Sequence, residues 1–362
     1  MGFDTVIIGA GPAGLAAARA SQKSGQRTLV IDDNWSAGGQ IWRGQAERAV
    51  PGVEFRFEQQ VTDLNFNGRR IILACGAREL FLPFPGWTLP HVVGAGGLQA
   101  LVKAGLDVRQ KKVVIAGTGP LLLAVAHNLR KAGANVILIA EQAPWSRLLP
   151  FGLALLRWPE KLWQSFTLAD TSYSPGRWPV EAEPGSVTLS DGRKIACDYL
   201  ACGFGLVPNL ELPTLAGCKI TNGFVQVDAY QRTSVDNIYA VGEITGIGGV
   251  EKAEAEGEAA GSGLQLQGNH SRFTKLLEQT FALRPELQSL PRPNTIVCRC
   301  EDVTWQNIAA CRNRREAKLQ RRCGMGPCQG RICGPALTFL KQWPEDSTRP
   351  PVLPVSTRHL IE

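Results

Sequence analysis

The chain begins with a short apolar segment followed by small residues, a pattern typical of a buried strand that turns into a helix. Residues 6–8 are all apolar, and an alanine-rich stretch continues to about Lys23, where Gly25 is placed to cap the helix. A second apolar segment, Thr28–Ile31, follows directly. The spacing therefore predicts a strand, a tight turn, a helix and a second strand, which is the start of an α/β unit.

The same pattern recurs in the middle of the chain. Residues 113–116 predict a strand, Gly117–Pro120 a turn, the apolar stretch through Lys131 a helix, and Val136–Ile139 another strand. Two such units in one chain predict a duplicated α/β architecture.

The rest of the chain divides into shorter elements. Residues 167–186 are rich in Pro, Gly, Ser and Trp, which predicts an irregular connection, and Val187–Ile195 predicts a hairpin. Glu251–Gln267 predicts a helix. Pro285–Pro293 contains three prolines and is the best candidate linker, so we expect a domain boundary near residue 290.

Composition and charge narrow the function classes. The 362 residues carry a net charge of +7, but the Lys and Arg are scattered, which favours a solvated surface or an acidic partner protein over nucleic-acid binding. No export signal and no apolar run long enough to span a bilayer is visible, so the cytoplasm is the expected location. Ten cysteines do not fit a disulfide protein there, and six of them fall between Cys298 and Cys333, which indicates a metal site.

The first glycine turn has the residues that a dinucleotide requires. Gly9 permits the turn, Gly11 lets a pyrophosphate approach the backbone, and Gly14 allows close helix–strand packing. Asp32 ends the second strand, where a carboxylate accepts hydrogen bonds from ribose hydroxyls. The candidate contacts of this turn are Gly9, Gly11, Pro12, Ala13, Gly14 and Asp32.

Three further segments, 38–40, 72–77 and 238–243, complete a pattern that resembles thioredoxin reductase and related FAD-dependent pyridine nucleotide oxidoreductases. The resemblance implies two interleaved Rossmann-like domains and bound FAD, with another adenine nucleotide or an empty site as alternatives. Glu243 stands where that family has an aspartate that binds the ribityl chain. The residues implied by these segments are Gly39, Gln40, Ala74, Gly76, Gly242 and Glu243.

The second glycine turn departs from the dinucleotide pattern. Leu122 occupies the position of the third glycine, which weakens a pyrophosphate site, although Glu141 ends the next strand and is able to take a ribose. We therefore expect a structural relic here rather than a working NAD(P)H site. No Cys-x-x-Cys occurs in this domain, which excludes the dithiol chemistry of thioredoxin reductase.

The cysteine-rich segment predicts an iron–sulfur cluster. Cys298 and Cys300 are able to hold one iron, and Cys328 and Cys333 the other. The pattern resembles the bacterioferritin-associated-ferredoxin type of [2Fe-2S] domain, with a closing Cys-x4-Cys pair. Zinc on the same four thiolates, and a site without metal, are the alternatives. Cys311 and Cys323 are spare, and Cys323 is able to substitute as a ligand.

The combination of motifs covers nearly the whole chain. It resembles the A-type subunit of opine (octopine or nopaline) oxidases, the B-type subunit of hydrogen cyanide synthase and the alpha subunit of dye-linked proline or hydroxyproline dehydrogenases. The segments that carry this resemblance are 75–79, 84–90, 203–209 and 324–330. The resemblance implies an FAD-binding domain (1–105 and 205–285), an NAD(P)-binding-like domain (106–204), a small α-helical [2Fe-2S] domain (294–345) and an extended tail (346–362).

In function, the resemblance implies an electron-transfer subunit of an amino-acid, imino-acid or opine dehydrogenase. The partner it implies is a D-amino-acid-dehydrogenase-like flavoprotein, with a second flavin such as FMN at the junction. The resemblance is also compatible with a small ferredoxin-like subunit as a further partner, and with peripheral contact between the protein and a membrane. The chain itself offers no catalytic acid–base residue, because its four histidines are isolated. The alternative functions are a self-contained NAD(P)H-dependent reductase and a non-catalytic nucleotide-bound scaffold.

Overall fold

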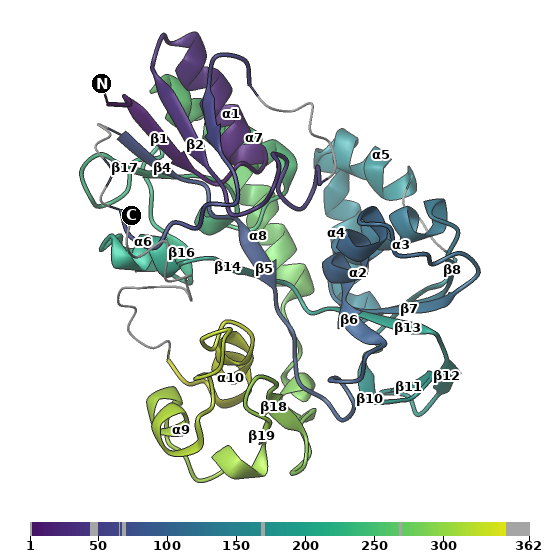
Figure 1. The fold of residues 1–362 in the computed structure, drawn as a ribbon. Coiled ribbons are helices and arrows are strands. Elements are labelled where there is room, and N and C mark those ends of the chain that lie inside the picture. Colours follow the sequence, from purple (N-terminus) through teal and green to yellow (C-terminus); the bar gives the residue numbers. More distant parts are fainter. Residues whose placement is uncertain are drawn as a thin grey trace. The chain divides into compact units, whose positions relative to one another are not determined.

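The computed structural model describes residues 2–43, 50–64, 66, 70–167, 171–267 and 270–344. These residues form two compact units (Figure 1). Among the described residues, unit 1 contains those up to Arg78 and Val207–Thr274, and unit 2 contains Glu79–Leu206 and 275–344. Unit 2 thus begins at Glu79. The predicted domain bounds, which place the NAD(P)-binding-like domain at 106–204, stay a prediction. The tail expected at 346–362 lies outside the described residues.

Unit 1 is built on a parallel sheet of five strands in the order β17-β4-β1-β2-β3. Its central strands are buried from end to end, as their unbroken apolar sequences require in a sheet covered on both faces. The strands are β1 (Thr5–Ile8), β2 (Thr28–Ile31), β3 (Glu54–Arg56), β4 (Arg70–Leu73) and β17 (Ile238–Ala240).

Two helices, α1 (Pro12–Lys23) and α7 (Val250–Ser262), lie side by side in unit 1 (Figure 1). Their contact depends on small residues, because a Cβ at Gly257 would lie 2.1 Å from the Ala13 carbonyl oxygen and one at Gly261 would lie 2.3 Å from that of Ala17. This close approach holds the start of α1 in a fixed place. The helix begins at Pro12 and ends before Gly25, as the sequence predicts.

Unit 2 repeats the arrangement with a parallel sheet in the order β6-β13-β7-β8-β9. The helix α3 (Leu121–Lys131) follows β7, and α2 (Ala95–Lys103) follows β6. The duplicated α/β architecture predicted from the sequence is therefore confirmed. The strands are β6 (Val92–Gly94), β7 (Lys112–Gly117), β8 (Asn135–Glu141), β9 (Tyr173–Pro175) and β13 (Tyr199–Gly203).

The predicted hairpin forms, but the irregular connection before it is more regular than expected. Strands β11 (Ser186–Leu189) and β12 (Lys194–Ala196) pair antiparallel around the Asp191–Gly192 turn. The segment 167–186, which was expected to be irregular, contains two strands. Strand β9 joins the parallel sheet, and strand β10 (Pro179–Glu183) joins the antiparallel sheet of β11 and β12. Tertiary pairing with neighbours distant in sequence overrides the local turn-forming composition there.

The proline-rich segment expected to be a linker is packed against unit 2. It forms a short 3-10 helix, η4 (Pro285–Ser289), and Leu287 is fully buried. Leu287 and Leu290 share one apolar cluster with Phe84 and with Leu340 of the cysteine-rich module. The proline run is thus part of the core that joins this module to the rest of unit 2.

The cysteine-rich module contains two short strands and two helices around its own apolar cluster. Asn313 caps α9, because its side-chain oxygen accepts a hydrogen bond of 2.8 Å from the Glu316 amide. The elements are β18 (Ile296–Cys298), β19 (Val303–Thr304), η5 (Gln306–Ile308), α9 (Arg314–Arg321) and α10 (Cys333–Lys341).

The remaining elements connect or flank the sheets. Strands β5 and β14 pair at the two places where the chain passes between the units. They are β5 (Ala77–Glu79), β14 (Leu206–Pro208), α4 (Trp145–Ala154), η2 (Leu155–Arg157), α5 (Pro159–Thr167), α6 (Glu211–Leu215), β15 (Ile220–Thr221), β16 (Phe224–Val225), η3 (Gly242–Thr245) and α8 (His270–Phe281).

Candidate cofactor-binding sites

The first glycine turn lies tightly against the ends of two strands. Gly9 has φ +108°, and a Cβ there would lie 2.3 Å from the Ala74 carbonyl oxygen at the end of β4. A Cβ at Gly14 would lie 1.8 Å from the Gly9 carbonyl oxygen. Both glycines are therefore required by packing within the protein.

Gly11 is different, because nothing lies within 4 Å of the position that its Cβ would take. It is the N-cap of α1, and Pro12 and Ala13 form the first turn of that helix. On the other side of the turn, Gly39 approaches Gly11 so closely that its Cβ would lie 3.0 Å from the Gly11 Cα. The open space at Gly11, beside free amides at a helix N-terminus, suits a pyrophosphate.

Asp32 ends β2 beside this turn and is almost fully buried. One carboxylate oxygen accepts a hydrogen bond from the Ala10 amide. The other accepts from the Asn34 amide at 2.8 Å and from its side-chain nitrogen at 2.7 Å. These donors fix the carboxylate at the strand end, where a ribose hydroxyl is recognised in dinucleotide-binding folds.

The Gly242–Glu243 turn comes to the same part of unit 1. A Cβ at Gly242 would lie 3.0 Å from the Ala13 Cβ in α1. One Glu243 carboxylate oxygen accepts a hydrogen bond of 3.1 Å from the Gly249 amide, whereas Oε2 is buried and has no hydrogen-bond partner among the described residues. Burial raises the pKa of Glu243. A buried carboxylate oxygen without a donor fits a ligand that brings hydroxyl groups to it.

A buried ion pair that the sequence reasoning missed stabilises this turn. Lys252 Nζ lies 2.8 Å from Glu256 Oε1, one helical turn apart on α7. The other Glu256 oxygen accepts from the Gly242 amide at 2.8 Å and from Thr245 Oγ1 at 2.7 Å. Pairs of Lys and Glu four residues apart in a helix are common on solvent-exposed faces, so the sequence did not indicate that this pair would be buried.

The other residues predicted for this site are placed around it. Ala74 contacts the turn through Gly9, and Gly76 adopts φ +65° in open space just after β4. Gln40 follows Gly39 and is exposed. Together, the open approach at Gly11, the carboxylate of Asp32 and the unpaired oxygen of Glu243 fit an FAD molecule.

The second glycine turn has its acidic residue already occupied. Glu141 is fully buried, and it accepts hydrogen bonds from Thr118 Oγ1 (2.9 Å) and from the amides of Gly119 (2.7 Å) and Ala143 (2.8 Å). The Tyr173 hydroxyl donates a fourth at 3.3 Å. This carboxylate, which the sequence left able to take a ribose, holds the turn together.

The chain itself covers this second turn. Arg147 Nη1 donates to the Ala282 carbonyl oxygen at 2.7 Å, and Gln142 Oε1 accepts from the Arg284 amide at 3.1 Å. The Phe281 ring packs edge-on against Phe151 and contacts the position of a Cβ at Gly119. Gly119 corresponds to Gly11 of the first turn, so an aromatic ring stands here where the first turn is open.

Glu141 predicts a specific pH dependence of stability. Burial raises the pKa of Glu141 to about 7, although its hydrogen-bond donors oppose the rise. Because the folded pKa is above the ordinary value of 4.5, stability is expected to fall as the pH rises from about 4.5 to about 7, by up to about 3 kcal/mol. Urea unfolding of the wild type and of Glu141→Gln across this range measures the contribution. Identical pH slopes in the two proteins would contradict it.

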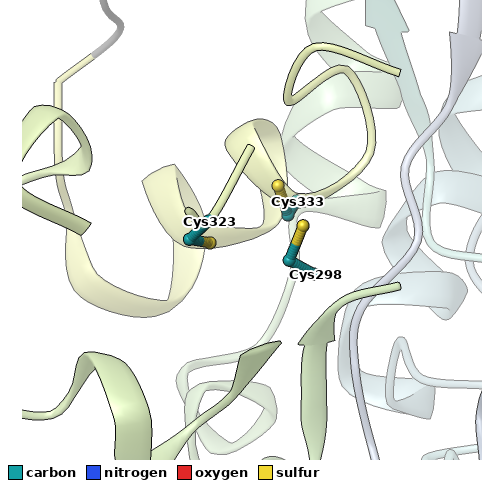
Figure 2. Close-up of side chains that lie close together, drawn as sticks. All are labelled: Cys298, Cys323 and Cys333. Carbon is teal, nitrogen blue, oxygen red and sulfur yellow. The ribbon is translucent and has the colours of Figure 1, made fainter. Parts of the chain in front are cut away.

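Three cysteines of the cysteine-rich module gather at one buried point. The Sγ atoms of Cys298, Cys323 and Cys333 all lie within 4.8 Å of one another. Cys298 ends β18, Cys333 begins α10, and Cys323 follows α9 by two residues. Figure 2 shows their three side chains close together. Two of the four predicted ligands are therefore together with a cysteine that was expected to be spare.

The other two predicted ligands form a second, more exposed pair. Cys300 is exposed, Cys328 is half-buried, and their side chains are within hydrogen-bonding reach of each other. The structure thus groups Cys298 with Cys333 and Cys300 with Cys328, whereas the sequence suggested one iron for each consecutive pair. Each of these two pairs thus takes one cysteine from each end of the module.

The three sulfurs of the buried group differ in their preference for the charged form, because hydrogen bonding to Cys298 raises the pKa of Cys323 and of Cys333 while it lowers that of Cys298. Hydrogen bonds from the thiols of Cys323 and Cys333 lower the pKa of Cys298 to about 2, and the Gly324 amide donates to its sulfur at 3.3 Å. The Arg314 guanidinium is in contact range of Gly334, and its charge opposes the rise in the pKa of Cys323. Arg314 had no distinguishing signal in the sequence. Thiolate sulfur is the form that binds metals.

An apolar surface lies elsewhere on unit 2. Helix α4 has an apolar sequence, yet none of its residues is buried. Trp145, Leu149 and Leu153 follow one another at intervals of four and are 58–72% exposed, and Leu156 and Trp163 extend this surface. A cluster of large exposed apolar side chains of this kind marks an interaction site. In the described part of the chain, no helix combines the length and the hydrophobicity needed to cross a bilayer.

The chain is similar to subunits of known oxidoreductases over almost its full length. It is 28% identical to the A-type subunit of an opine oxidase from Rhizobium meliloti (strain 1021), covering 98% of this chain and 97% of that protein. It is 27% identical to the hydrogen cyanide synthase subunit HcnB of Pseudomonas protegens, covering 92% of this chain and 90% of that protein.

Solved structures of low sequence identity share the fold of this chain. An L-proline dehydrogenase from P. horikoshii matches with a TM-score of 0.69 and 19% identity, covering 99% of this chain and 79% of that chain. A thioredoxin reductase from T. acidophilum matches 72% of this chain and 96% of its own, with a TM-score of 0.56 and 20% identity.

The family pattern called pyridine nucleotide-disulphide oxidoreductase matches residues 3–257, which include both glycine turns. The glycine turn of unit 1, its strand-end carboxylate and the Gly242–Glu243 turn are all parts of that matched region. This chain belongs to the pyridine nucleotide-disulphide oxidoreductase family and is an FAD-dependent oxidoreductase.

Proposed function

We propose that this chain is the electron-transfer subunit of a multi-subunit dehydrogenase that oxidises an amino acid, an imino acid or an opine. In this proposal it accepts electrons from a D-amino-acid-dehydrogenase-like flavoprotein and passes them to an external acceptor. FMN at the interface with that partner belongs to the same proposal. The relatives support a partner, because they are named as subunits of opine oxidase and of hydrogen cyanide synthase.

The observation that carries the proposal is the grouping of the cysteines in unit 2. Cys298 with Cys333, and Cys300 with Cys328, provide the four thiolates that a [2Fe-2S] cluster requires. Such a cluster would supply one-electron transfer, and FAD would accept electrons in pairs. The Gly324 amide would donate a hydrogen bond to a ligand sulfur, a contact that tunes cluster potentials.

The covered second turn supports an electron donor other than NAD(P)H. Glu141 is saturated by protein donors, and Phe281 stands over the turn at the position that is open in unit 1. In unit 1, Gly11 leaves the approach for the FAD pyrophosphate free, Asp32 would hold a ribose, and Glu243 would accept from a ligand hydroxyl.

The proposal predicts which reductant reduces the flavin. In the anaerobically purified complex of this chain with its partner subunit, we expect iron and acid-labile sulfide in equal amounts. An opine or imino-acid substrate is expected to bleach the flavin absorbance, and NADH at the same concentration to leave it unchanged. Zinc in place of iron, or faster bleaching by NADH than by the substrate, would overturn the proposal. Dye reduction that survives removal of all four ligand cysteines would instead support a scaffold role.

The apolar surface of α4 is the surface that we assign to the partner subunit. Its large side chains are exposed, the neighbouring Arg157 is exposed, and aromatic and arginine residues are enriched at subunit interfaces. The net charge of +7 favours an acidic rim on the partner.

Negative charges introduced on the α4 surface are expected to weaken the binding of the partner subunit. Leu149→Glu with Leu153→Glu should weaken co-purification of the partner by at least about a hundredfold, because two carboxylates would be desolvated at an apolar interface. Leu264→Glu is the matched control, since Leu264 is 67% exposed but stands outside α4. Unchanged co-purification of the double variant, or loss of self-association instead, would show that another surface binds the partner.

A further inference from the structure

We propose that Cys323 is a reserve sulfur ligand for the iron that Cys298 and Cys333 bind. This inference rests on the proposed [2Fe-2S] cluster and adds a fifth cysteine to the four that would bind it. The module offers more thiols at the site than a cluster needs, since [2Fe-2S] takes four. The position of Cys323 determines which of the two irons the extra thiol is able to serve.

The first argument is the distance between the sulfur atoms. The Sγ atoms of Cys298, Cys323 and Cys333 lie within 4.8 Å of one another. Two thiolates on one tetrahedral metal, with bonds of about 2.3 Å, are about 3.8 Å apart. The three sulfurs are therefore within about 1 Å of the separation that binding to a common metal requires. Figure 2 shows the Cys323 side chain pointing toward the other two.

The second argument is that the backbone holds Cys323 in this place. Arg322 ends α9 in the left-handed region with φ +61°, and the Cys323 amide then donates to the Ala317 carbonyl oxygen at 3.2 Å. This arrangement is a helix C-cap, which fixes the direction in which the next side chain leaves the helix. Cys323 is 5% exposed, so its side chain is enclosed within the module beside Cys298 and Cys333.

The third argument is the contrast with the remaining cysteines of the module. Cys300 and Cys328 lie beside each other on the more exposed side of the site and are outside the buried group. Cys311 is as well buried as Cys323, but its sulfur is not among the three that gather. Among the described residues, Cys323 is thus the thiol placed to replace Cys333 or Cys298, and it is not placed to replace Cys328.

In this proposal Cys333 would bind the iron of the intact protein, and Cys323 would lie beside it without binding. When Cys333 is replaced by alanine, the Cys323 thiol is expected to release its proton to solvent and to form the iron–sulfur bond that Cys333 made. The number of thiolate ligands and the charge of the site are then unchanged. The ligand geometry differs, which alters the spectrum of the reduced cluster.

The test measures iron, acid-labile sulfide and the electron paramagnetic resonance spectrum of the dithionite-reduced full-length chain, purified without oxygen. Cys323→Ala should keep the wild-type iron content, and Cys333→Ala should keep more than half of it with shifted g values. The double variant Cys323→Ala/Cys333→Ala should lose iron by about tenfold or more, because only three thiolates remain. Cys311→Ala/Cys333→Ala is the matched control and should retain the iron of Cys333→Ala.

The variant Cys328→Ala and the double variant Cys323→Ala/Cys328→Ala should contain the same amount of iron, because Cys323 is not placed to replace Cys328. Where an alanine variant fails to fold by near-ultraviolet circular dichroism, the serine variant at the same position replaces it. Loss of iron from Cys323→Ala alone would make Cys323 a resident ligand, and equal loss from Cys333→Ala and the double variant would remove the reserve role. Wild-type protein without iron and sulfide would instead overturn the cluster itself.

Discussion

Replacing Gly11 by valine is expected to weaken FAD binding by at least about tenfold, or about 1.4 kcal/mol, while leaving unit 1 folded. No protein atom lies within 4 Å of the position of a Cβ at Gly11, so a side chain there has room in the protein. The backbone is also permissive, with φ −75° and ψ −174°. The valine methyl groups would occupy the approach of the pyrophosphate to the start of α1.

The flavin content of purified protein and a titration of the flavin-free protein with FAD measure this effect. Gly14→Ala is the contrasting variant, because its Cβ would lie 1.8 Å from the Gly9 carbonyl oxygen. We expect that variant to lower the thermal midpoint of unfolding even without FAD, whereas Gly11→Val should not lower it. Full flavin content in Gly11→Val would show that the nucleotide does not approach this glycine.

Replacing Lys252 by methionine is expected to lower the free energy of unfolding by about 3 kcal/mol. Lys252 and Glu256 are both almost fully buried, and methionine would leave the Glu256 carboxylate without its cation. The turn at Gly242 depends on the same carboxylate, which accepts a hydrogen bond from its amide. FAD affinity should therefore fall together with stability, because Glu243 belongs to this turn.

Thermal unfolding followed by circular dichroism measures the loss, which corresponds to a decrease of about 10 °C in a unit of this size. The double variant Lys252→Met/Glu256→Gln should recover part of it, since a neutral amide needs no buried cation. Losses from the two single variants that add up in the double variant would show that the two side chains do not act as a pair.

Much of this protein is readable from local pattern, because its elements follow strong short-range rules. The two strand–turn–helix units begin and end within a residue or two of their predicted bounds, since unbroken apolar strands and glycine turns allow few other conformations. The leucine at the third-glycine position also led to the prediction that the second turn is a weak pyrophosphate site. Leu122 occupies it and is fully buried against β13, as a contact distance of 3.4 Å to a Cβ at Gly203 shows.

The pairings between distant residues had no such local signal. The burial of Lys252 with Glu256 arises because α7 packs closely on α1, and the cover over the second turn comes from Phe281, far along the chain. Segments that are irregular in composition, such as Tyr173–Pro175, became strands when a neighbouring edge was available to pair with them.

The sequence alone determined that cysteines cluster near the C-terminal end and that a dinucleotide turn lies at the N-terminal end. Which sulfurs face one another was decided by tertiary structure, because the loop after α9 carries Cys323 to the meeting point of β18 and α10. Spacing along a chain limits the reach of each ligand, but the direction of a side chain depends on the caps and turns that hold its backbone.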